Sequence, residues 1–195
     1  MTPRFSLCVY CGSRPGADPS FARVATEVGH WIGAYGGQLV YGGGNNGLMG
    51  VLATAALEAG ARVVGVIPHS MVEREWAKRD CTELHVVDNM HQRKSMMAER
   101  ADAFLALPGG IGTFEELFEV WSWRMLDFHR KPVGLLDTGG YYQFLLQFLQ
   151  QSVGHGFMNA TQMELLTVDS EVDVLLPRLV QAAGIDPRPV DVSQI

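Results

Sequence analysis

Hydrophobic residues are distributed along this chain in two distinct patterns. Short and almost uninterrupted apolar runs occur at 5–11, 38–41, 62–67, 84–87, 103–107, 132–136 and 165–168. Longer segments with helical spacing lie between or after them, at 19–35, 48–59, 90–101, 113–128, 141–151 and 172–183. Apolar runs of this length are typical of strands that are buried on both faces of a parallel sheet. The alternation predicts an α/β fold: a single doubly wound Rossmann-like domain with a mostly parallel sheet flanked by helices.

The length and composition of the chain agree with one domain. A chain of 195 residues with 47% hydrophobic and 18% charged residues can bury a core without disulfides. We expect this domain to span 1–185, followed by a loose C-terminal tail, DPRPVDVSQI, at 186–195. The formal net charge is −6 and no long basic run occurs, which argues against binding to nucleic acid.

The sequence has few features of membrane, secreted or metal-binding proteins. The apolar stretch near the N-terminus is too short for a signal peptide, and no apolar segment reaches the length of a membrane span. Cys8 and Cys11 are three positions apart on an expected strand and point to opposite faces, so we expect reduced structural cysteines. The six histidines show no H-x-x-x-H pair. We therefore expect a cytoplasmic protein without a membrane anchor, a metal site or another cofactor.

Three glycine-rich turns follow expected strands. Their sequences are CGSRPG at 11–16, YGGGNNGLMG at 41–50 and PGGIGTFEE at 108–116. In a doubly wound sheet ligands bind at the carboxyl ends of the strands, and a glycine-rich turn before a helix can hold a phosphate. Gly42, Gly44 and Gly47 match G-x-G-x-x-G, but the next strand ends in GVIPHS, without the acidic residue of a dinucleotide site. With G-K-[ST] also missing, the turns predict a nucleotide site that is neither an NAD site nor a Walker-type ATPase site.

Charged residues near the third turn and in the segment 90–101 are the candidates for chemistry. Thr113-x-x-Glu116 fits a capping box, in which Thr113 caps the helix and Glu116 binds the Thr113 amide. The same carboxylate could instead stabilise the oxocarbenium-like state of a breaking ribosyl C–N bond and orient water, and the residues alone leave both interpretations open. Arg93 begins a helix at the ligand edge, where its guanidinium could clamp a phosphate or hold Glu116. Lys94, taken alone, fits a solvated charged face.

Three stretches of the chain resemble one known family. YGGGNNGLMG at 41–50, MHQRK at 90–94 and PGGIGTFEELFEV at 108–120 are similar to motifs of the LOG ("lonely guy") cytokinin riboside 5′-monophosphate phosphoribohydrolases. The resemblance runs from CVYCGS at 8–13 to KPVGLLDTGGYY at 131–142. It implies hydrolysis of AMP or an N6-modified AMP, the nucleoside 5′-monophosphate substrate, to a free base and ribose 5-phosphate without a metal or redox cofactor.

The resemblance also assigns roles to individual residues. Arg93 and Glu116 correspond to the catalytic pair, and the phosphate cradle corresponds to Gly110, Gly112 and Thr113. The substrate-binding residues that it implies, together with those we expect on the second glycine turn, are Gly43, Gly44, Asn45, Glu75, Lys94, Gly109, Gly110, Ile111, Gly112, Thr113, Phe114, Glu115 and Ser122. Ile111 and Asn45-Asn46 stand where plant-type members carry tyrosine and Ser-Ile, a difference that bears on the preference for a prenylated base.

Oligomeric state and function class each leave alternatives at this point. The segment 114–126 is apolar nearly all round, which fits either a deeper core or contact with a second subunit. The family resemblance implies a homodimer. The alternative function is a non-catalytic carrier of a nucleotide or of the molybdenum cofactor with the same fold, which would need no paired arginine and glutamate. A pyridoxal enzyme with a lysine Schiff base is formally possible, but no motif supports it.

Overall fold

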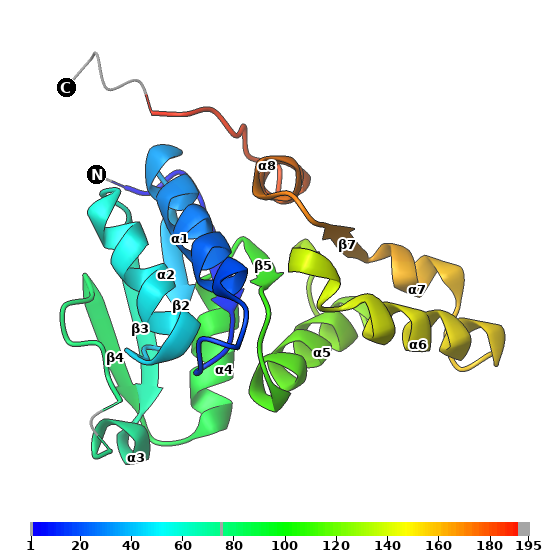
Figure 1. Ribbon diagram of the computed structural model, residues 1–195, viewed down its shortest axis with the longest axis horizontal. Helices are drawn as coiled ribbons and strands as arrows, with labels where there is room; N and C mark the ends of the chain where they lie inside the picture. The colour runs from blue at the N-terminus through cyan, green and yellow to red at the C-terminus, as the bar shows by residue number, and fades with distance from the viewer. Residues whose placement is uncertain (1, 75, 191–195) are drawn as a thin grey trace.

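One parallel sheet organises the protein. In the computed structural model, which describes residues 2–74 and 76–190, seven strands follow the order β4-β3-β2-β1-β5-β6-β7 (Figure 1). They are β1 (Ser6–Tyr10), β2 (Gln38–Tyr41), β3 (Arg62–Pro68), β4 (Glu83–Val87), β5 (Ala103–Ala106), β6 (Val133–Leu136) and β7 (Leu166–Asp169). Neighbouring strands pair in parallel throughout this sheet.

Helices cover both faces of the sheet. They are α1 (Pro19–Ala34), α2 (Gly47–Glu58), α3 (His69–Val72), α4 (Met90–Glu99), α5 (Ile111–Met125), α6 (Gln143–Gly154), α7 (Ala160–Glu164) and α8 (Val172–Ala182), with a 3-10 helix η1 (Thr138–Gly140). One hydrophobic core lies between the sheet and α1, α2 and α8, and a second lies between the sheet and α4, α5 and α6. The predicted doubly wound α/β fold is therefore confirmed. Among the described residues, no helix combines the length and the apolar composition that a membrane span requires.

The predicted elements are all present, with ends that shift by a few residues. The largest differences at helix starts are in α5, which begins at Ile111 instead of 113, and in α6, which begins at Gln143 instead of 141. The hydrophobic pattern does not predict α3, α7 and η1, because helices of three to five residues are too short to show a helical period.

The two cysteines of the first strand region lie in different cores, as predicted. Cys8 packs in the core beneath α4 and α5, and Cys11 packs in the core beneath α1 and α2. Both thiols are free, and burial raises the pKa of Cys8 to about 12. Because the thiolate is the reactive form, Cys8 is an inert core residue at neutral pH.

The described part of the expected tail, 186–190, is attached to the rest of the protein. The backbone carbonyl of Arg188 accepts a hydrogen bond of 2.7 Å from Arg4 Nη1. The amide of Val190 donates to the carbonyl of Ala34 at the end of α1, at 2.8 Å. The segment therefore crosses back to the amino-terminal edge of the sheet.

The direction of winding reverses next to the central strand β1. From β1 the chain builds outward through β2, β3 and β4, and it then returns to place β5 on the other side of β1. The loops that leave β1 and β5 therefore diverge from neighbouring strand ends, the place where open α/β sheets bind ligands. A hydrogen bond of 3.0 Å from the amide of Gly12 to the carbonyl of Pro108 joins the two loops at their bases.

Helices α1 and α2 approach each other through glycine. A Cβ atom at Gly33 would lie 2.4 Å from both the carbonyl oxygen and the Cβ of Ala59, and one at Gly29 would lie 2.6 Å from the carbonyl oxygen of Leu52. Backbone atoms cannot move aside as a flexible side chain can. The close contact of these helices therefore requires glycine at both positions.

We expect Gly33→Ala to lower the free energy of unfolding by about 1–3 kcal/mol, the usual cost of overpacking a tight interface. Chemical denaturation followed by circular dichroism measures this change. Gly154→Ala is the matched control, because Gly154 is also helical but a Cβ atom there meets nothing within 4 Å. Equal stability of Gly33→Ala and the wild-type protein would contradict the assignment of Gly33 to this contact.

Candidate active site

A cavity of about 680 Å³ lies at the carboxyl edge of the sheet, where the winding reverses. All three glycine-rich turns contribute to its lining, through 11–16, Gly42, Gly44 and 108–113. The prediction that these turns meet at one edge is therefore confirmed. Apolar side chains line much of the remaining wall: Ile67, Leu48, Met49, Met71, Met90 and Trp76. A site of mixed glycine backbone and apolar side chains suits a ligand with a polar end and a flat apolar end.

The start of α5 forms the polar end of this cavity. Gly110 is the N-cap residue, and no side chain caps the helix. The amides of the first turn have no partner within the helix, and they make a helix start a favourable place for an anion. A Cβ atom at Gly110 or Gly112 would meet nothing within 4 Å, so both glycines border open space. This open space is what an approaching ligand group would occupy.

Of the two interpretations left open for Thr113 and Glu116, the capping box is wrong. The extended backbone of Gly110 begins the helix three residues earlier, so Thr113 is already inside its first turn. Thr113 instead packs against Gly109, where a Cβ atom would lie 2.1 Å from Thr113 Oγ1. The Glu116 carboxylate is consequently not used to cap the helix.

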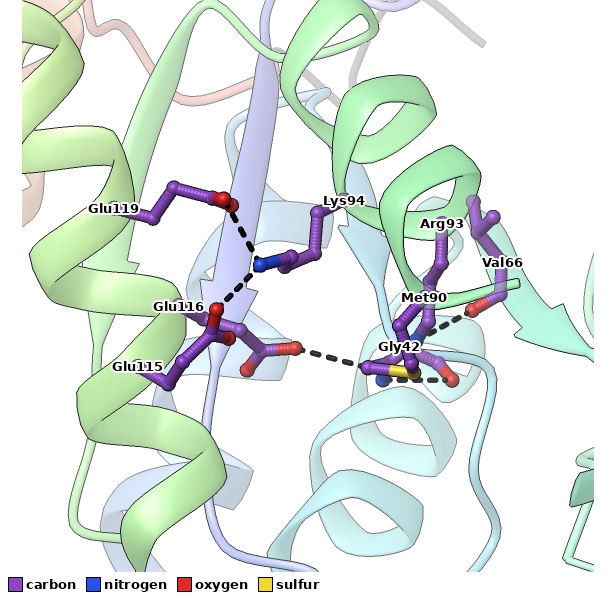
Figure 2. A network of polar contacts seen from close by, with 8 residues as sticks. All are labelled: Gly42, Val66, Met90, Arg93, Lys94, Glu115, Glu116 and Glu119. Atoms are coloured by element: carbon purple, nitrogen blue, oxygen red, sulfur yellow. Dashed lines mark hydrogen bonds and ion pairs between the residues drawn. The ribbon is translucent and has the colours of Figure 1, made fainter.

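Glu116 instead forms an ion pair with Arg93, and both residues line the cavity (Figure 2). Both side chains are buried, and Arg93 Nη1 donates to Glu116 Oε1 at 3.0 Å. Arg93 also donates from Nε to the carbonyl of Val66 at 3.1 Å and from Nη2 to that of Gly42 at 3.2 Å. Three oxygen acceptors, from β3, from α5 and from the loop after β2, fix the guanidinium plane. Of the two roles considered for Arg93, the geometry supports holding Glu116.

Gly42 is required by this arginine. A Cβ atom at position 42 would lie 1.8 Å from Arg93 Nη2, so any side chain would displace the guanidinium. The glycine that suggested a dinucleotide motif therefore makes room for a catalytic candidate.

The surroundings of Glu116 set its protonation. Burial raises the pKa of Glu116 to about 6, and the negative charges of Glu115 and Glu119 act in the same direction. The positive charges of Arg93 and Lys94 oppose the rise but do not cancel it. Glu116 is therefore mostly ionised at neutral pH, yet close enough to its pKa to accept a proton.

Lys94 is buried between two carboxylates of α5, so the expectation of a solvated face is wrong. Its ammonium contacts Glu115 and donates to Glu119 Oε1 at 2.9 Å (Figure 2). These ion pairs join α4 to α5 beside the Arg93–Glu116 pair. Glu119 was not among the predicted site residues, although its i, i+4 spacing from Glu115 places both on one face of the helix.

The structure brings together only part of the predicted substrate-binding set. The cavity lining includes Gly44, Gly109, Gly110, Ile111, Gly112, Thr113 and Glu115, besides Arg93 and Glu116. It does not include Gly43, Asn45, Lys94, Phe114 or Ser122. Glu75 lies outside the described residues.

Three of the residues away from the cavity have clear surroundings. Asn45 lines a separate groove between α1 and α2, Phe114 packs against the ring of Tyr142, and Ser122 is exposed further along α5. The cavity is also lined by Arg14 and Tyr141, which were not among the predicted site residues. Arg14 stands within the first glycine turn, and its charge could have signalled a place near an anion. In the described residues, no group of three or more His, Cys, Asp or Glu side chains is placed to hold a metal ion.

The fold and the site together define a class: a doubly wound α/β protein with a glycine-rich helix start that no side chain caps and a buried arginine–glutamate pair in one cavity. Residues 49–179 match a family model described as "Possible lysine decarboxylase". The chain belongs to this family, in its LOG-type branch.

Two relatives show the extent of the similarity. The chain is 43% identical over 182 residues to LOG4 of Oryza sativa subsp. japonica, a probable cytokinin riboside 5′-monophosphate phosphoribohydrolase, and the match covers 93% of this chain and 79% of that protein. It is 42% identical over 177 residues to the Arabidopsis thaliana phosphoribohydrolase LOG3, and the match covers 91% of this chain and 82% of that protein.

Among solved structures, the molybdenum cofactor carrier protein of Chlamydomonas reinhardtii superposes with a TM-score of 0.69 at 20% identity, over 94% of this chain and 99% of that one. At that identity the likeness concerns the fold alone.

The charges around Glu116 predict opposite effects of two substitutions on its pKa. Arg93→Met removes a positive charge that lowers the pKa, so the pKa should rise above about 6. Glu115→Gln removes a negative charge that raises it, so the pKa should fall. Titration of the Glu116 carboxyl carbon by NMR measures both. Shifts in the same direction, or none, would show that these charges do not control Glu116.

Proposed function

We propose that this protein hydrolyses the N-glycosidic bond of adenosine 5′-monophosphate or an N6-modified form of it, releasing the free base and ribose 5-phosphate. The observation that carries the proposal is the buried Glu116 carboxylate, held by Arg93 in the cavity that the start of α5 lines. The named activity of the LOG relatives supports the same reaction.

The helix start and Glu116 are spaced to act on two ends of one ribose 5-phosphate. The 5′-phosphate binds the amides at Gly110 to Thr113, where the helix dipole favours negative charge. Arg14 adds a positive charge to the lining of the cavity. At a rise of about 1.5 Å per residue, Glu116 lies about 7.5 Å further along α5 than Ile111, comparable to the span of a ribose 5-phosphate. The ribose C1′ then lies near the carboxylate, and the base lies against the apolar wall.

Glu116 acts on the bond between C1′ and the base. As this bond lengthens, positive charge develops on the ribose ring, and the ionised carboxylate stabilises it. Glu116 also accepts a proton from a water molecule whose oxygen bonds to C1′. The electron pair of the broken bond leaves with the base, which takes up a proton. The sum is the addition of one water across the glycosidic bond.

The buried pair also separates this proposal from a carrier function. A protein that only binds a nucleotide gains nothing from a desolvated carboxylate with a raised pKa, which costs stability. The carrier structures are similar to this chain in fold alone.

Purified protein should release base from AMP and from N6-isopentenyl-AMP but not from adenosine, which lacks the phosphate. Glu116→Gln should slow release by about 100-fold or more, because the neutral amide neither stabilises the cation nor accepts a proton. Chromatography of the free base measures both. Glu119→Gln is the matched control: it lies one turn further along α5, outside the cavity lining, and should stay within a few-fold of wild type. Nucleotide binding without base release would support a carrier instead.

We also propose that the protein is a homodimer that pairs through α6. Phe144 is 80% exposed and Phe148 is 62% exposed, one helical turn apart, and Phe157 just beyond the helix is 88% exposed. The expected apolar helix 114–126 mostly fills the core, since Leu117, Val120 and Trp121 are buried. Three strongly exposed aromatic side chains therefore lie on α6 or just beyond it, and α6 extends beyond the sheet in Figure 1. Aromatic side chains in such number are typical of a protein interface.

Phe148→Glu should convert the dimer into a monomer, because a charge would be buried without a partner at the interface. Size-exclusion chromatography with light scattering at micromolar concentration measures the mass. Gln150→Glu adds the same charge to the same helix, two residues away and on a different side, and should leave the dimer intact. A wild-type protein that is monomeric under these conditions would contradict the proposal.

A further inference from the structure

Two adjacent tyrosines hold the glycine loop that precedes α5. Tyr142 donates its hydroxyl to the carbonyl of Leu107 at 2.6 Å, and Tyr141 donates its hydroxyl to the carbonyl of Gly109 at 2.5 Å. The carbonyl between them, that of Pro108, accepts from the amide of Gly12. Three consecutive carbonyls of the loop therefore each have a donor from elsewhere in the chain. The stretch DTGGYY at 137–142 helped to identify the family, but the proposed reaction gives it no role.

The backbone around these tyrosines is built to place both side chains on the loop. Gly139 and Gly140 adopt φ values of 62° and 75°, a left-handed conformation that favours glycine. The amide of Tyr142 then donates to Asp137 Oδ1 at 2.6 Å, which closes the turn. The sharp turn brings two successive residues to the same loop.

The two tyrosines differ in exposure. Tyr142 is buried, whereas Tyr141 is 41% exposed and lines the cavity. The ring of Tyr141 packs edge-on against Phe21 of α1, with centroids 5.5 Å apart, and against Tyr142 at 4.9 Å. The two ring contacts therefore hold the Tyr141 side chain in place, and the hydrogen bond to Gly109 fixes its hydroxyl.

The bond to Gly109 also fixes an amide. In a planar trans peptide the C=O and the following N–H point in opposite directions, so a donor on the Gly109 carbonyl sets the direction of the Gly110 N–H. Both flanking residues are glycine, and this peptide could otherwise rotate at little steric cost. No side chain at Gly110 would restrain it, since a Cβ atom there meets nothing within 4 Å.

We propose that Tyr141 is a positioning residue for the phosphate end of the site. Its hydroxyl fixes the Gly109–Gly110 peptide so that the Gly110 amide faces the bound anion. Tyr142 supports the same loop at Leu107. The inference rests on the proposed function, because it takes the start of α5 as the place of the 5′-phosphate. It adds a residue that acts through the loop and does not touch the reacting bond.

Tyr141→Phe tests the inference by removing one oxygen and keeping the ring. Loss of a single hydrogen bond that orders the loop should raise the dissociation constant of ribose 5-phosphate, measured by calorimetry, about three- to tenfold. The KM for AMP should rise by the same factor, while kcat changes less than twofold. Tyr142→Phe should act in the same direction. Tyr35→Phe is the matched control, because Tyr35 follows the far end of α1 and should leave all three constants unchanged.

The outcomes separate this inference from the reaction itself. Tyr141→Phe with wild-type affinity for ribose 5-phosphate overturns the inference, whether or not the wild-type protein hydrolyses AMP. A fall in kcat with unchanged affinity also overturns it, because the tyrosine would then act on the chemical step. If wild-type protein hydrolyses no nucleotide but Tyr141→Phe still weakens ribose 5-phosphate binding, the inference holds and the proposed function fails.

Discussion

The ion pair between Arg93 and Glu116 is the interaction on which the rest of the site depends. Removing two charges from water is costly, and a buried pair is tolerated only when the remaining hydrogen-bonding groups are also satisfied. Here the carbonyls of Val66 and Gly42 satisfy the guanidinium. This arrangement fixes the spacing of α4 and α5 at the pair and requires glycine at position 42. Several features that look like separate motifs in the sequence are thus consequences of one buried contact.

The cavity is lined by two kinds of group, backbone amides and carbonyls in one part and apolar side chains in another. Backbone groups line the cavity at the start of α5, where hydrogen bonds from Tyr141, Tyr142 and Gly12 restrain the loop. Methionine and tryptophan form much of the apolar lining, and methionine side chains adapt to ligands of different shape. In the proposed reaction the constant part of the substrate meets the rigid end. The variable part, the base and its substituent, meets the adaptable one.

Local sequence patterns predicted the fold, and they predicted at which edge of the sheet the cavity lies, because strand and helix periods depend on residues close together in the sequence. Arg93 and Glu116 were assigned by family resemblance, whereas the residues alone left Glu116 between a cap and a catalyst. The capping box failed because the start of α5 is decided by the backbone of Gly110, which a pattern of side chains does not reveal. The burial of Lys94 was missed because its partners lie on another helix. The periodicity of a sequence does not reveal contacts between distant segments.

The reversal of winding at β1 means that the two members of the pair belong to different halves of the chain. Arg93 follows the strands on one side of β1, and Glu116 follows the first strand on the other side. The charge of Arg93 meets the carboxylate of Glu116 only where α5 lies against α4. Neither half can bury its own charge alone. An intact Arg93–Glu116 pair is therefore a local sign that the elements on both sides of β1 are assembled on one another.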